Sequence, residues 1–262
     1  MMTRSQGRSY VLNRSMLLVI VAVLLGQGSP QRVQPKAADV EKNRRAAVET
    51  RNVAFAFENG RNGQERNDRE AARLYRLAAD RGDTVSMGRL AQMYADGRGV
   101  ASKSNAEASA WWRTAAKLGD ARAQYSLALF HYSGQSDVKS EHLSKAVELM
   151  KLSAEQGFVK AQFNFGLMHE RGVPGADLKP NVELAAKWYL ASANQGYPPA
   201  QYNLGLMLRQ GRGVPQSDRE ATNWLTKAAE QGHAHARHKL THVEVSRLRG
   251  RAEVSERVCL GH

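Results

Sequence analysis

The chain has 262 residues, of which 42% are hydrophobic and 7 are proline, and this composition excludes a disordered chain. Its 38 lysines and arginines outnumber its 25 acids, and the formal net charge of +13 favours anionic partners such as lipid headgroups, acidic proteins or cell-wall polymers. The alternative is an ordinary solubilising surface, because the arginines are scattered along the helices without a compact cluster. We expect no specific nucleic-acid partner. Cys259 is the only cysteine, which excludes an intrachain disulfide framework.

Residues 1–28 have the pattern of a signal peptide. Arg4, Arg8 and Arg14 precede an apolar run over residues 16–25, and small residues follow that run. A membrane-spanning helix needs about 20 apolar residues, and this run is much shorter. The pattern therefore predicts export.

Residues 29–45, which contain Pro30 and Pro35, are expected to form a flexible linker. The predicted location is the periplasm or the extracellular space. The alternatives are a chain tethered to the membrane by an uncleaved N-terminal segment and, in a eukaryote, the endoplasmic reticulum.

Five copies of one phrase follow the linker, each ending in a glycine. The glycines recur at intervals of 36 to 39 residues, at Gly82, Gly119, Gly157, Gly196 and Gly232. Before each glycine, apolar and small residues stand at helical spacing, as in Ala221, Trp224, Leu225, Ala228 and Ala229. This pattern predicts a helix that ends at a left-handed glycine, and Asp68 and Asp218 are the expected N-caps.

A second helix precedes this one in every period. The segments 123–134, 161–172 and 200–211 share apolar and small positions and end in glycine. Small residues at matching places predict close contact within each helix pair: Ala54, Ala91, Ala128, Gly166 and Gly205. A fixed period of this length is typical of a solenoid built of helix pairs.

The combined pattern resembles the Sel-1-like repeat, a relative of the tetratricopeptide repeat. It reads A-x-x-x-L-G-x-M-(Y)-x-x-G-x-G-V and then D-x-x-x-A-x-x-W-(Y)-x-x-A-A-x-x-G. The resemblance implies an all-α, right-handed α/α superhelix of about five to six repeats with a concave groove. The expected units cover residues 46–242: 46–83, 84–120, 121–158, 159–197, 198–233 and a partial unit 234–242. Residues 243–262 are expected to form a capping helix and tail.

The tetratricopeptide register predicts which first-helix residues face the groove. The middle of the groove is then apolar and aromatic, which favours an amphipathic helix or an extended peptide as ligand. The alternative is that these side chains pack between repeats. The candidate partner-binding residues are Phe55, Tyr125, Leu129, Phe163, Leu167, Glu170, Tyr202, Leu206, Arg209, His238 and His242.

No metal, cofactor or catalytic site is predicted. His235, His238 and His242 have helical spacing that suits a divalent cation, but few carboxylates lie nearby, and a pH-sensitive contact fits these histidines better. No phosphate loop, nucleophile elbow or HExxH motif is present. We therefore expect a protein that is not an enzyme.

The expected function is an exported adaptor or regulator that binds another protein, such as a membrane sensor or an envelope component. The resemblance implies roles of this kind in bacterial envelope signalling. The alternatives are a structural or cell-wall scaffold, a secreted effector that acts on a host, and an adaptor of the endoplasmic reticulum.

Overall fold

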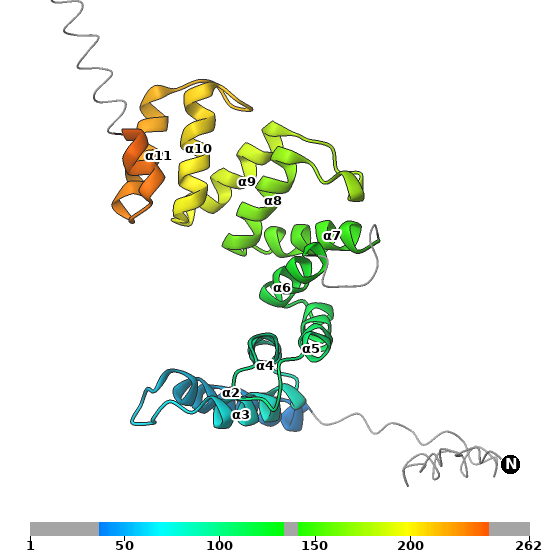
Figure 1. The fold of residues 1–262 in the computed structure, drawn as a ribbon. Helices are drawn as coiled ribbons and strands as arrows, with labels where there is room; N and C mark the ends of the chain where they lie inside the picture. The colour runs from blue at the N-terminus through cyan, green and yellow to red at the C-terminus, as the bar shows by residue number, and fades with distance from the viewer. Residues whose placement is uncertain (1–36, 134–140, 241–262) are drawn as a thin grey trace, which may run out of the picture. The chain divides into compact units, whose positions relative to one another are not determined.

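The structure, a computed structural model, describes residues 37–133 and 141–240. The chain divides into two compact units, residues 1–42 and 43–262, and the repeats lie in the second unit. Ten α-helices and one short 3-10 helix lie in the described ranges (Figure 1): α2 Ala37–Asn59, α3 Asp68–Asp80, α4 Thr84–Asp96, α5 Asn105–Lys117, α6 Ala121–Tyr132, α7 Glu141–Glu155, α8 Val159–Arg171, η1 Pro174–Ala176, α9 Val182–Asn194, α10 Pro198–Gln210 and α11 Asp218–Glu230.

The helices pack in the order in which they follow in the chain. Contacts join α3 to α4, α4 to α5, and so on to α10 and α11. The even-numbered helices are the first helices of the repeats, and the odd-numbered ones are the second helices. Each unit buries its apolar face against its neighbours, which confirms the predicted all-α solenoid of helix pairs.

Small residues bring these helices together. The alanine eleven positions before each repeat glycine is completely buried in all five units: Ala71, Ala108, Ala146, Ala185 and Ala221. The large residue seven positions before the glycine is also buried: Tyr75, Trp112, Met150, Tyr189 and Leu225. The repeat glycines have φ values between 83° and 90°, so they end the second helices as predicted.

Two features of the helix starts differ from the prediction. The N-caps of α3 and α11 are Asn67 and Ser217, one residue before the predicted Asp68 and Asp218. Asn67 is extended, and its side chain accepts the Glu70 backbone N–H at 3.0 Å, whereas Asp68 is already helical. In addition, α2 begins at Ala37, so residues 37–45 of the expected linker are helical.

Buried glutamines connect successive units. Gln124, Gln162 and Gln201 on the first helices each donate to a carbonyl of the preceding second helix, at 3.3–3.4 Å. Each also accepts the amide of the glutamine that precedes the next repeat glycine, at 2.7–2.9 Å. These bonds satisfy buried amides at the helix contacts and fix how each unit meets the next.

No helix in the described ranges is both long enough and apolar enough to span a bilayer. The apolar run 16–25 lies outside these ranges, as do residues 243–262, for which a capping helix and tail are predicted.

Candidate functional site

The predicted groove contains exposed apolar side chains on the first helices. Phe55 on α2 and Leu129 on α6 are 38% and 39% exposed. Leu167 and Leu206 occupy the same repeat position in the later units and are half-buried. Leu167 packs against the core cluster of the fourth and fifth units.

The neighbouring aromatic column lies one turn earlier and packs between repeats. Each ring contacts the residue that follows the next repeat glycine. The centroid distances are 5.2 Å for Tyr125–Phe158, 5.3 Å for Phe163–Tyr197 and 4.7 Å for Tyr202–His233. Burial raises the pKa of Tyr125, whose hydroxyl oxygen accepts a 3.0 Å hydrogen bond from Asn164. The three rings therefore contribute to the joints between units.

A hollow of about 300 Å³ lies on the first-helix side of the second and third units. Its lining comes from α4, α5 and α6: Gln92, Ala95, Asn105, Trp112, Tyr125, Ser126, Leu129, Phe130 and Ser133. Trp112 is buried and lies 6.2 Å from Phe130, so aromatic rings contribute to an apolar surface, while amides and hydroxyls supply polar groups. This combination suits one apolar anchor of a peptide.

The stripe that carries Leu129 is basic. Residues three, seven, ten and fourteen positions after a repeat glycine share one helix face. In the described parts of the chain this face carries Arg89, Arg122, Lys160, Arg171 and Lys239, against one acid, Asp96. The second helices, in contrast, carry acids and bases in nearly equal number. The first-helix stripe therefore carries an excess of positive charge, which is complementary to acidic groups.

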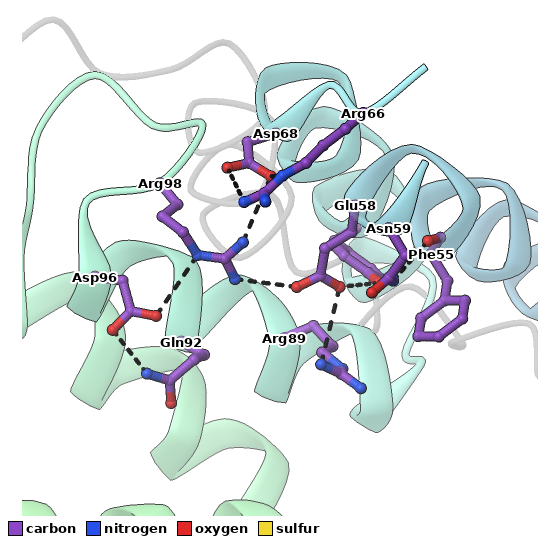
Figure 2. A network of polar contacts seen from close by, with 10 residues as sticks. Phe55, Glu58, Asn59, Arg66, Asp68, Arg89, Gln92, Asp96 and Arg98 are labelled. Atoms are coloured by element: carbon purple, nitrogen blue, oxygen red, sulfur yellow. Dashed lines mark hydrogen bonds and ion pairs between the residues drawn. The ribbon is translucent and has the colours of Figure 1, made fainter. Parts of the chain in front are cut away.

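Glutamates near the ends of two first helices connect neighbouring units. Glu58 is buried and accepts the Tyr75 hydroxyl at 2.7 Å, and Arg98 of the next unit donates to it at 3.0 Å (Figure 2). Arg89 lies 3.8 Å from the same carboxylate. Burial and Glu58 raise the pKa of the Tyr75 phenol, so this tyrosine stays protonated.

The fourth unit repeats this bridge. Glu170 accepts the Tyr189 hydroxyl at 2.5 Å and forms an ion pair with Arg212 of the fifth unit. Glu170, predicted at the edge of the groove, is thus engaged between units. Arg209 takes the corresponding place in the fifth unit, and one of its Nη atoms is buried with no hydrogen-bond partner in the described parts of the chain.

The predicted C-terminal histidines are only partly described. His238 is exposed at the end of the described range, and His242 lies beyond it. Within residues 37–133 and 141–240, no three His, Cys, Asp or Glu side chains are grouped closely enough to hold a metal ion.

A histidine pair at the α6–α7 contact was not anticipated from the sequence. The Nδ1 atoms of His131 and His142 are 2.8 Å apart, so one ring donates its Nδ1–H to the other. Burial, His142, Arg113 and Lys145 lower the pKa of His131. Burial also lowers the pKa of His169.

These lowered pKa values predict that acid destabilises the fold. The folded chain keeps His131 neutral at pH values at which the unfolded chain protonates it, so stability falls as the pH drops through the usual histidine range. We expect the thermal midpoint to decrease between pH 7.5 and 5.5, and His131→Leu to reduce that decrease, since Leu208 occupies the same repeat position. Thermal unfolding followed by circular dichroism measures both, and an unchanged pH dependence in the variant would rule out this role for His131.

A second and larger hollow, of about 740 Å³, lies on the second-helix side between α9 and α11. None of its lining residues was predicted as a site. The sequence does contain a signal for this hollow, the loss of a basic residue at one repeat position. The residue six positions before the repeat glycine is basic in the first three units (Arg76, Arg113 and Lys151), but it is Leu190 in the fourth unit.

Known proteins match both the repeats and the fold. The family model described as Sel1 repeat matches residues 51–83, 84–120, 121–158, 159–197 and 198–233, and from residue 84 onward these segments coincide with the expected units. A Sel1 repeat protein from Oxalobacter formigenes is 27% identical with a TM-score of 0.67, and the match covers 78% of each chain.

A protective antigen of uropathogenic Escherichia coli, described as having an SLR fold, is 28% identical with a TM-score of 0.53. The match covers 75% of the present chain and 48% of the antigen, so the chain spans about half the length of that protein.

Proposed function

The chain belongs to the Sel1 repeat family, whose members generally mediate protein–protein interaction, and from this premise we propose that it is an exported adaptor or regulator. In this proposal the first-helix face binds one segment of another protein, and binding modulates a membrane signalling protein. The family is typically a non-enzymatic interaction scaffold.

The observation that carries the proposal is the hollow beside Leu129. It combines an exposed leucine, a buried tryptophan and a basic stripe on one face. An apolar anchor would fill the hollow, and acidic side chains on either side of it would meet Arg122 and Lys160. The proposed ligand is therefore an acidic segment with apolar anchors.

The basic stripe also supports a second candidate, a scaffold bound to an anionic cell-wall polymer. The two candidates differ in their need for an apolar anchor. Binding to purified cell wall that depends on the stripe arginines, but not on Leu129, would favour the scaffold.

The direct test replaces Leu129 with aspartate in the full chain. The substitution removes an apolar side chain that would contact the ligand's anchor and adds a charge that repels an acidic ligand. We therefore expect recovery of the partner after crosslinking in the source cells to fall about tenfold or more. Quantitative mass spectrometry of the crosslinked material measures the loss.

Leu118→Asp is the matched control. Leu118 is 59% exposed at the end of α5 and does not line the hollow, so this variant should retain the partner. Equal recovery with both variants would contradict the assignment of the site. An unfolded Leu129→Asp chain, detected by circular dichroism, would show instead that this residue serves packing.

A further inference from the structure

The hollow between α9 and α11 combines an apolar lining with acids. Leu190, Leu204, Leu208 and Val214 supply apolar surface, and Trp224 supplies an aromatic one. The other lining residues are Glu183, Ala186, Lys187, Gly213, Pro215, Gln216, Ser217 and Glu220.

The same place in the first two units is filled by the protein's own arginine. Arg76 lies over the Trp111 ring, with its Cζ atom 5.2 Å from the centroid, and its guanidinium donates to the Tyr94 hydroxyl at 3.5 Å. An arginine over an indole is a favourable cation–π pair. The first two units therefore show that a guanidinium fits between successive second helices.

The fourth and fifth units keep the indole and lose the arginine. Counted from the repeat glycines, Trp224 corresponds to Trp111, while Leu190 takes the place of Arg76 and Leu208 that of Tyr94. Both polar partners are thus replaced by leucines, one of which, Leu190, is 42% exposed.

The joint between the fourth and fifth units also has an acid where the first unit has a basic residue. Glu183 stands where the first unit has Arg69, and Glu220 lies across the hollow on α11. The lining therefore carries two carboxylates and one amine, that of Lys187. Lys227 lies 4.4 Å from the Trp224 centroid but does not line the hollow.

We propose that this hollow binds an arginine side chain presented by a basic segment of a partner protein. The guanidinium lies over the Trp224 ring, as the guanidinium of Arg76 lies over the Trp111 ring. The carboxylates of Glu183 and Glu220 accept its hydrogen bonds. Leu190 and Leu208 cover the aliphatic part of the arginine. The inference concerns a surface other than the first-helix face and does not depend on the function proposed there.

The test titrates the full chain with the peptide N-acetyl-Leu-Arg-Leu-amide and follows the indole N–H resonance of Trp224 by NMR, assigned with Trp224→Phe. A counterpart with citrulline, which has nearly the shape of arginine but no charge, is the comparison ligand. Because the charge supplies both the cation–π contact and the ion pairs, we expect the arginine peptide to bind about tenfold more tightly or better.

In Leu190→Arg the new side chain should fill the hollow, as Arg76 fills the equivalent place in the first unit. The peptide should then cause no shift of the Trp224 resonance. Leu184→Arg is the matched control: Leu184 lies on the same helix, is 36% exposed and does not line the hollow, so binding should persist. Glu183→Gln should weaken binding about fivefold without affecting the fold.

The proposal would be overturned by equal affinity for the arginine and citrulline peptides, by binding that survives Leu190→Arg, or by no binding at all. If the peptide binds only after Arg247, Arg249, Arg251 and Arg257 are changed to glutamine, the occupant is the chain's own C-terminal segment, and the assignment to a partner is wrong.

Discussion

Gly99→Ala is expected to lower the free energy of unfolding of the first two units by about 3 kcal/mol or more. A Cβ atom at this position would lie 2.0 Å from the carbonyl oxygen of Asp68 and 2.4 Å from its carbonyl carbon. These are backbone atoms at the start of α3, so no side-chain rotation relieves the contact. The loop has to move away from the first unit, which also separates Arg98 from Glu58.

Hydrogen–deuterium exchange of α2 and α3 measures this effect locally, since the ends of a repeat array can open independently of its centre. Gly63→Ala is the control. Its φ of 76° resembles the 67° of Gly99, but an added Cβ would meet nothing within 4 Å, so only the backbone cost of about 1 kcal/mol remains. Similar losses of protection in the two variants would contradict the steric explanation.

Glu58→Ala is expected to cost about 3 kcal/mol by a different route. It removes the acceptor of the buried Tyr75 hydroxyl, so this polar group stays buried and unpaired. It also leaves Arg98 without the Glu58 carboxylate (Figure 2). Denaturant unfolding followed by circular dichroism, together with exchange in α2 and α3, measures the loss.

Two companion variants separate the causes. Glu58→Gln keeps an oxygen that accepts the Tyr75 hydroxyl and should recover part of the stability. Glu148→Ala removes an exposed acid from α7 and should change the stability by less than about 0.5 kcal/mol. If Glu58→Ala reduces the stability no more than Glu148→Ala, the contacts of Glu58 with Tyr75 and Arg98 do not hold the units together.

The periodic positions explain why the fold could be predicted from the sequence. Each small residue recurs at a fixed distance from a glycine, and the structure buries these positions in every unit, except that Ala229 in the last unit is half-buried. The N-caps of α3 and α11 were misplaced by one residue because Asn67-Asp68 and Ser217-Asp218 each offer two side chains that are suitable for capping. Glu70 and Glu220, three residues after the true caps, complete a capping-box pattern and could have decided between them.

The candidate site was harder to predict because exposure depends on the neighbouring unit. Tyr125, Phe163 and Tyr202 look available along their helices, but each packs against the residue that follows the next repeat glycine, namely Phe158, Tyr197 and His233. At the hollow that Trp224 lines, Leu190 stands where the first unit has Arg76. Such a feature becomes visible only when equivalent positions of different units are compared in space.

Site-specific photocrosslinking tests protein binding by the first-helix face most directly. A photoreactive amino acid is placed at Leu129 or, as a control, at Leu118 in the full chain, and its products are identified after illumination of the source cells. We expect one defined partner protein to be crosslinked from Leu129 and not from Leu118. Crosslinking of that partner from Leu118 alone, or of no protein from Leu129, would contradict binding at this face.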